Sequence, residues 1–411
     1  MRVTLTDPLS LIPGFAAALR EQRARYPAPE PAWQPVHTVY VPADAFGAGT
    51  VAEWGAAASA LLDAHLPDPA TLAELFEVSS RDLAVAVHDR VAGKLRTDPV
   101  EDLRIDFEDG YGVRDPAEED GHAVAAARAV AEMRDAGTLP RRWGLRVKSF
   151  ADGDPARSIR TLDGFLTALL DRAGTLPPGF VVTFPKVLMA DYLRQFARCL
   201  AALESGLGLS ERTLRFELQV EAPQTVLFLQ RSPETVLDGE GRLVAAHFGV
   251  FDYTAACGLP PHEQRLDHPA CDHARHVMQT VFAGTGVELA DGSLAAVPAT
   301  DSAHDVHALW RRHAALIRHS LAHGFYQGWD MHPSHLVSRY ATTYAFHMAG
   351  RARYGERVRA WRERRAADGG VLDEPATIKT LTAALSRCDH VLGEGAPGRG
   401  GAPAGGVAPG R

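Results

Sequence analysis

The feature of this sequence that most constrains its fold is a regular alternation of short apolar runs with longer stretches rich in Ala, Leu and Arg. The apolar runs lie at residues 36–42, 103–108, 144–150, 180–187, 214–221 and 244–252, with two further candidates at 286–290 and 325–333. Alternating strands and helices favour a parallel sheet covered by helices. Eight strands would close this α/β sheet into a TIM-type (β/α)8 barrel, which we predict; fewer would leave it open and doubly wound.

The composition is that of a globular protein. The chain has 411 residues, of which 46% are hydrophobic and 23% are charged, and its formal net charge is −8. This length allows one large domain or two smaller ones. Because the net charge is negative, we expect no general attraction to nucleic acid or to an anionic membrane, while a local positive charge would still bind a small anion.

The cysteines and the apolar residues indicate a cytoplasmic protein. The four cysteines lie far apart and form no CxxC pair, which fits a reducing compartment better than a disulfide framework. The first residues lack the basic region and apolar core of a signal peptide. No uncharged apolar run reaches the roughly 18 residues that a membrane span needs.

Four segments are expected along the chain. Residues 1–35 form an N-terminal extension with a short amphipathic helix at 11–25 and a Pro-rich connector. The barrel follows at 36–350, and a helical segment at 351–392 comes after it. Residues 393–411 are almost entirely Gly, Pro, Ala and Arg, a composition typical of a disordered tail.

Charged or polar side chains stand at the ends of nearly all the apolar runs. They are Glu108, Asp109, Arg146, Lys148, Lys186, Glu221, Asp252, Asp330 and His332. The C-terminal ends of barrel strands are where active sites form, although any one of these residues could equally be a solvated strand end. Acids and bases together on successive strands favour a metal site that faces an anionic substrate.

Glu221 and Asp252 are the candidate metal ligands, since each follows an apolar run. Each carboxylate could supply one oxygen to Mg²⁺ (or Mn²⁺), with water and substrate completing the octahedron. Read singly, each acid is more often a helix N-cap or a solvated turn residue. The pair therefore needs support from its neighbours.

Those neighbours are an arginine, a lysine and an acidic turn. Arg146 could bind a carboxylate through two parallel hydrogen bonds, unless it is a surface arginine at a strand edge. Lys186 could neutralise a substrate carboxylate or form a Schiff base. In the turn that contains Glu108 and Asp109, the acids could reach a metal through water or hold Arg146 and Lys186 in place; the alternative is a solvated acidic turn.

Histidines offer a competing metal site. The stretch 260–276 holds Asp272, His273 and His276, but its spacing fits no standard zinc pattern and favours a structural or surface role. His332 and His335 lack the intervening glutamate of a zinc protease, and we expect His335 on the surface of a helix. No phosphate-binding loop or dinucleotide fingerprint is present, which weighs against a kinase or a nicotinamide enzyme.

Several motifs occur together in a specific order. They are VYVPAD (39–44), DFEDGYG (106–112), LRVK (145–148), FPKV (184–187), QVEAPQ (219–224), FGVFDYTAACG (248–258) and GFYQGWDMHPSHL (324–336). In this order the chain resembles a bacterial branch of the Mg²⁺-dependent aldolase/citrate lyase β-subunit superfamily, which has a phosphoenolpyruvate/pyruvate-type barrel.

The resemblance implies roles for particular residues. Glu221 and Asp252 would hold Mg²⁺, and Arg146 would contact the carboxylate or carbonyl oxygen of the substrate. Glu108 and Asp109 would lie near the water network of the metal. His332 would lie at the end of the last strand and contact the substrate. Lys186, at the end of the run at 180–187, is the other candidate for substrate contact.

Three departures from the family pattern stand out. Lys148 replaces the usual asparagine, which could alter how the substrate is oriented. The long segment between Asp252 and Gly324 suggests an insertion or cap before the last strand. The catalytic base of thioester-processing relatives has no match in this chain.

The resemblance implies a Mg²⁺-dependent lyase or aldolase, or the reverse condensation, acting on a 2-oxo acid or an acyl thioester through an enolate. One alternative is phosphoryl or acyl transfer on a phosphoenolpyruvate-like substrate at the same metal site. Another is a non-catalytic protein that kept the fold. Family barrels of this kind also imply a homo-oligomer, a trimer or hexamer rather than a dimer.

Overall fold

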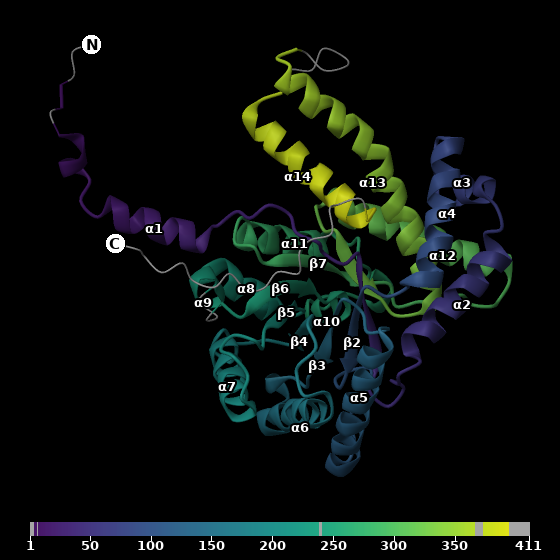
Figure 1. Ribbon diagram of the computed structural model, residues 1–411, viewed down its shortest axis with the longest axis horizontal. Helices are drawn as coiled ribbons and strands as arrows, with labels where there is room; N and C mark the ends of the chain where they lie inside the picture. Colours follow the sequence, from purple (N-terminus) through teal and green to yellow (C-terminus); the bar gives the residue numbers. More distant parts are fainter. Residues whose placement is uncertain (1–3, 6, 238–240, 366–372, 394–411) are drawn as a thin grey trace.

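Eight parallel strands form a closed barrel in chain order, as predicted, in a computed structural model that describes residues 4–5, 7–237, 241–365 and 373–393 (Figure 1). The strands are β1 His37–Pro42, β2 Asp102–Asp106, β3 Arg142–Arg146, β4 Phe180–Phe184, β5 Phe216–Val220, β6 Leu243–Phe248, β7 Glu288–Ser293 and β8 Gln327–Asp330. Each of the eight apolar runs, the two further candidates included, contains or overlaps one of these strands.

Helices cover the outside of the barrel. Those that follow strands β2 to β7 are α5 Pro116–Ala136, α6 Pro155–Ala173, α7 Asp191–Leu207, α8 Pro223–Arg231, α9 Pro233–Leu237, α10 Val250–Ala256, α11 Pro269–Phe282 and α12 Ala303–Ala322. Their apolar faces pack on the outward residues of the strands. For example, the ring of Phe196 in α7 stacks on Phe184 of β4 at 4.2 Å between centroids. The buried contacts of this layer form the core.

The inside of the barrel is charged. Arg104 of β2 is fully buried, and its guanidinium donates to both carboxylate oxygens of Glu217 on β5 and to the hydroxyl of Thr183 on β4. Strand β2 neighbours neither β4 nor β5, so these contacts cross the barrel interior. Asp102 accepts a further hydrogen bond from Arg104. Buried charges of this kind need such partners, and Arg104 has them.

Extra helices lie between β1 and β2. They are α2 Thr50–His65, α3 Pro69–Phe76 and α4 Arg81–Thr97, and they pack against α12 and the C-terminal helix α13 Pro333–Arg362. The segment between Asp252 and Gly324, where the sequence suggests an insertion or cap, consists of barrel elements: α10, α11, β7 and α12. The additional helices α2, α3 and α4 therefore lie after β1, outside the segment between Asp252 and Gly324.

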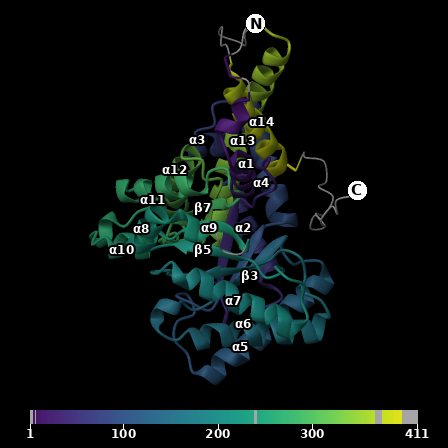
Figure 2. The ribbon, with the colours of Figure 1, turned by 90° about the vertical axis from the view of Figure 1, so that its left-hand side faces the viewer.

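The C-terminal helices α13 and α14 Pro375–Val391 pack side by side as a hairpin. Figure 2 shows this hairpin on the side of the molecule away from α5 and α6. At the other end of the chain, a helix predicted at 11–25 corresponds to α1 Phe15–Arg25, which buries none of its residues. The predicted disordered tail lies outside the described residues except for Gly393.

Two short additional helical turns, η1 Pro8–Leu11 and η3 Pro261–Glu263, lie before α1 and before α11, and a third, η2 Phe150–Asp152, precedes α6. None of the helices in the described part of the chain combines the length and apolar character that crossing a membrane requires.

Candidate functional site

The loop after β2 folds around the carboxylate of Asp106. The backbone N–H of Glu108 donates to its Oδ1 at 2.9 Å, and the N–H of Gly110 donates to its Oδ2 at 3.0 Å. A Cβ at position 110 would lie 2.6 Å from Oδ2, so only glycine lets the loop approach this closely. The loop therefore has a fixed shape at the C-terminal end of the strand.

Arg146, at the end of β3, is held by the acids of this loop. Its Nε and one terminal nitrogen donate to the two oxygens of Asp106 at 2.6 and 2.5 Å, and its other terminal nitrogen lies 3.2 Å from Glu108. The guanidinium also lies over the ring of Tyr40, 5.0 Å from its centroid. Burial alone would lower the pKa of Arg146, but the carboxylate of Asp106 raises it well above its ordinary value. The side chain is thus a fixed cation at the barrel mouth.

Lys186 connects the acidic loop with Glu221. Its Nζ lies 2.5 Å from both Glu108 and Asp109 and 3.9 Å from Asp252. Its backbone N–H donates to Oε1 of Glu221 at 2.7 Å. The residue has a φ of +47°, a left-handed conformation that costs a lysine free energy. Lys186 holds this conformation while its backbone N–H contacts Glu221 and its Nζ contacts Glu108 and Asp109.

Glu221 directly follows β5 and is almost completely buried. Its pKa is raised to about 8, first by burial and then by repulsion from Glu108 and Asp252. A Cβ on Gly249 would lie 2.4 Å from the Cβ of Glu221, so a glycine at position 249 makes the room that this side chain occupies. The carboxyl group is buried beside other acids, and this placement favours a cation next to it.

Asp252 lies on a helix, which differs from the sequence-based expectation that it ends a strand. Strand β6 stops at Phe248, and Asp252 belongs to the first turn of α10. Its side chain is 46% exposed, and burial of the remainder raises its pKa despite the nearby ammonium of Lys186. The helix brings Asp252 to the same mouth as Glu221, since Lys186 lies against both: its Nζ is 3.9 Å from Asp252 and its backbone N–H donates to Glu221.

The two remaining acids of the loop differ in protonation. Burial raises the pKa of Glu108 to about 7, although Arg146 and Lys186 oppose this. Burial alone would raise the pKa of Asp109, but the hydrogen bond and the positive charge of Lys186, with smaller contributions from Glu108 and Arg146, together lower it. Glu108 therefore changes charge close to neutral pH, while Asp109 stays ionised.

Lys148 and His332 do not join this group. The Nζ of Lys148 donates to the carbonyl oxygens of Phe107 and Gly112, both at 2.9 Å, so it supports the acidic loop from outside. His332 is the N-cap of α13, and its Nδ1 accepts from the backbone N–H of Ser334 at 3.2 Å. Its predicted contact with substrate stays a prediction.

Two further residues lie elsewhere than the sequence suggested. Asp330 faces the helical layer, where it pairs with Arg339 of α13 at 2.9 Å and with His37 at 3.0 Å. His335, expected on a helix surface, is fully buried; this prediction was wrong. Its Nδ1 accepts from the N–H of Met331 and its Nε2 lies 2.8 Å from the carbonyl oxygen of Ala296.

Sequence reasoning missed Tyr40 and Gly249. Tyr40 precedes the end of β1 by two residues, and the alternation of inward and outward side chains along a strand could have assigned it to the barrel interior. No local signal identifies Gly249, because its role depends on Glu221 from the neighbouring strand.

Comparison with known proteins adds a family and a fold. A family model described as "Domain of unknown function (DUF6986)" matches residues 15–392. No curated protein sequence matches the chain significantly.

Several solved structures are similar to this chain. Malate synthase of Haloferax volcanii in a lead(II) complex shares 15% identity at a TM-score of 0.51, covering 76% of this chain and 74% of that one. Its pyruvate/acetyl-CoA ternary complex shares 15% identity at 0.50, covering 75% and 69%. CitE of Mycobacterium tuberculosis, with magnesium, acetoacetate and coenzyme A, shares 17% identity at 0.48, covering 87% and 98%. At 15% identity, the malate synthase likeness shows a common fold.

Proposed function

This chain belongs to the DUF6986 family, and we propose that it is a Mg²⁺-dependent enzyme that forms or cleaves a carbon–carbon bond beside a carbonyl group. The substrate would be a 2-oxo acid, an acyl thioester or both. The observation that carries the proposal is the set of opposed charges at the barrel mouth, where Glu221 and Asp252 face the fixed cations Arg146 and Lys186.

The acids at the mouth fit a divalent cation. Five carboxyl groups, those of Asp106, Glu108, Asp109, Glu221 and Asp252, share two cationic side chains. Full ionisation would leave an excess of three negative charges. Burial first, and then repulsion among these acids, raises the pKa values of Glu108, Glu221 and Asp252. Mg²⁺ prefers such oxygen ligands and usually retains waters, so one or two carboxylates are enough.

Glu221 and Asp252 would hold the metal, because Asp106 already binds Arg146, while Glu108 and Asp109 bind Lys186. When bound, Mg²⁺ would act as a Lewis acid that stabilises negative charge on a substrate oxygen.

The chain's own residues would orient the substrate. Arg146 is charged, buried and fixed by Asp106, so it can bind a substrate carboxylate or carbonyl oxygen without reorganising. Lys186 would supply a second positive charge at the same mouth. Glu108 lies between these two cations, within contact of both, and is the residue that we propose to take up or release a proton.

The similar structures support the substrate class. The malate synthase with this fold was solved with pyruvate and acetyl-CoA, a 2-oxo acid and an acyl thioester. A shared fold alone does not define chemistry, so the class rests also on Arg146 and Lys186, which suit an anionic substrate.

The test combines metal binding with a substrate screen. In the double variant Glu221→Gln and Asp252→Asn, Mg²⁺ affinity measured by calorimetry should be lost, and turnover should fall by about 10²–10³. The wild type would be screened with 2-oxo acids and acyl thioesters, with and without Mg²⁺. Asp115→Asn is the matched control, since Asp115 belongs to the same acidic stretch but caps α5. A double variant that binds Mg²⁺ as tightly as the wild type would overturn the assignment.

A further inference from the structure

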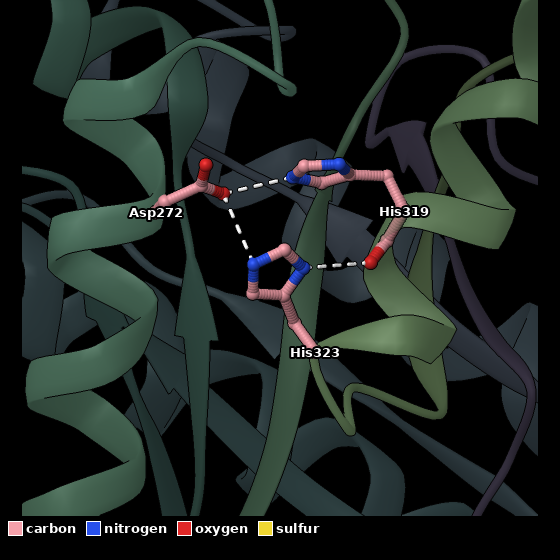
Figure 3. A group of neighbouring side chains, drawn as sticks. All are labelled: Asp272, His319 and His323. Atoms are coloured by element: carbon pink, nitrogen blue, oxygen red, sulfur yellow. Dashed lines mark hydrogen bonds and ion pairs between the residues drawn. The ribbon is translucent and has the colours of Figure 1, made fainter.

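A second cluster of potential metal ligands lies on the outer helices, away from the residues of the barrel mouth described above. Asp272 is in the first turn of α11, His319 is in the last turn of α12, and His323 directly follows that helix. Figure 3 shows the carboxylate of Asp272 pointing from one helix toward the two imidazoles on the other. All three side chains are about one quarter exposed, so an ion from solvent can reach them.

The distances in this cluster suit a small metal ion. Oδ1 of Asp272 lies 2.8 Å from Nε2 of His319 and 3.6 Å from Nε2 of His323, and the three ligand atoms lie within 4.8 Å of one another. Zinc binds nitrogen and oxygen at about 2.0–2.2 Å in a tetrahedron, which places ligand atoms about 3.3 Å apart. The separations of 2.8 and 3.6 Å bracket this value, so small side-chain movements would bring the three ligand atoms around one ion.

A hydrogen bond fixes the tautomer of one histidine. Nδ1 of His323 lies 2.9 Å from the backbone carbonyl oxygen of His319. A carbonyl oxygen can only accept, so Nδ1 carries a proton, and in the neutral ring the lone pair is on Nε2, the nitrogen that lies 3.6 Å from Asp272. Histidines that bind metals usually donate their other N–H to such an acceptor, which holds the ring in position.

The surrounding charges permit a cation. Arg275 donates to Oδ1 of Asp272 at 2.7 Å, but it is also held by Asp291 at 2.9 Å and by the carbonyl oxygen of Leu266 at 2.6 Å. One arginine thus faces two acids. The contacts of Asp272 with Arg275, His319 and His323 all fall on Oδ1, so a metal would share that oxygen with Arg275 or bind Oδ2 after the carboxylate turns. Exposed His276 lies one turn after Asp272, with its ring 5.6 Å from that of His323.

We infer that Asp272, His319 and His323 form a binding site for a divalent transition-metal ion of the zinc class. Two imidazoles and one carboxylate suit such an ion better than Mg²⁺, which prefers oxygen ligands. Water or His276 would occupy the remaining position. A bound ion would join the start of α11 to the end of α12, which leads into β8, and would stabilise the folded state by mass action. This inference does not depend on the proposed function.

The test measures Zn²⁺ binding to the full, untagged chain after removal of metal by a chelator, with Mg²⁺ in excess. Calorimetry should show one tight Zn²⁺ site in the wild type. In His319→Ala and in His323→Ala the affinity should fall by more than about 100-fold, because loss of outer-shell partners alone costs 10–100-fold. His273→Ala is the matched control: His273 is exposed on α11 next to Asp272, and its removal should leave the tight site unchanged.

Two further measurements separate metal binding from folding. Zn²⁺ should raise the melting temperature of the wild type and of His273→Ala, and should leave that of the His319 and His323 variants unchanged. If either alanine variant is unfolded without metal, the nearly isosteric Asp272→Asn takes its place with the same expected loss. Variants at His319 and His323 that are folded and bind Zn²⁺ with wild-type affinity would overturn the inference, as would a wild type without a tight site.

Discussion

The substitution Gly249→Ala tests the candidate metal site through a residue that carries no ligand. A Cβ at this position would lie 2.4 Å from the Cβ of Glu221 and 2.7 Å from its Oε2. Carbon atoms in contact are normally about 3.5–4.0 Å apart, so the side chain or the turn after β6 must move by about 1 Å or more. Functional groups tolerate roughly 0.5 Å of displacement, and Glu221 would also lose its 2.7 Å hydrogen bond from Lys186.

We expect this variant to bind Mg²⁺ about 10–100-fold more weakly, the range typical of disturbing the support of a metal ligand. Crowding should also lower the free energy of unfolding by about 1–3 kcal/mol. Calorimetry and urea unfolding measure the two effects. Gly164→Ala is the control: Gly164 is exposed within α6, a Cβ there meets nothing within 4 Å, and alanine should stabilise the helix by about 1 kcal/mol. Equal Mg²⁺ affinity in both variants would refute the reasoning.

Two further predictions concern buried charges. Asp330→Asn should lower the free energy of unfolding by about 3–5 kcal/mol, because it leaves the buried guanidinium of Arg339 without its carboxylate. Urea unfolding measures this change. The control is Asp171→Asn at an exposed position, which should stay within about 0.5 kcal/mol of wild type. Burial lowers the pKa of His247 to about 4 in the folded protein, whereas its pKa in the unfolded chain is about 6.5. The folded state is therefore destabilised as the pH falls from above 6.5 toward 4, and the free energy of unfolding should drop by about 2 kcal/mol between pH 7 and pH 5. His247→Gln should remove that part of the pH dependence, and an unchanged difference between the two pH values would contradict the prediction.

The barrel was predictable because its strands are short, apolar on their outward faces and separated by helices. The run at 180–187 shows this, since β4 is buried along its whole length. The charged interior was not predictable from local pattern. Arg104 and Glu217 are far apart in the sequence, and their pairing follows only from closure of the barrel. In sequence alone, a charged residue within an apolar run indicates a strand end or a sheet edge. Its oppositely charged partner inside the barrel is identified only from the structure.

The position of Asp252 shows where a periodicity argument fails. The run at 244–252 is mostly apolar, but its last part contributes to a helix in which Val250, Tyr253 and Thr254 are buried. Those residues follow helical spacing, a signal too short to separate from the preceding strand. His335 was misplaced for another reason. Helix α13 packs against α2, α4, α12 and α14, so it is buried on several sides and has no single apolar face.

The acids and bases of the candidate site were predictable as a group, because the C-terminal ends of parallel strands meet at one mouth. Their pairing was not. The sequence alone leaves open whether the acidic turn reaches a metal or holds Arg146 and Lys186, and in the structure its acids contact Arg146 and Lys186. It is this pairing that separates Glu221 and Asp252 from the other acids, since a carboxylate already bound to a fixed cation is a poorer metal ligand.

The two proposed metal sites differ in chemistry because they arise from different parts of the fold. Strand ends at the mouth bring together carboxylates, whose oxygens suit Mg²⁺, whereas His319 in the last turn of α12 and His323 at its C-cap, four residues apart, place two imidazoles on one side of the helix end. Zinc generally binds protein ligands, carboxylates included, more tightly than Mg²⁺ does, so the oxygen ligands at the mouth would not by themselves exclude Zn²⁺ from that site. A nitrogen-containing site on the outer helices would take up zinc first. In the wild type, therefore, low Zn²⁺ should leave Mg²⁺ binding at Glu221 intact, and in His319→Ala the same Zn²⁺ should begin to compete with Mg²⁺ there.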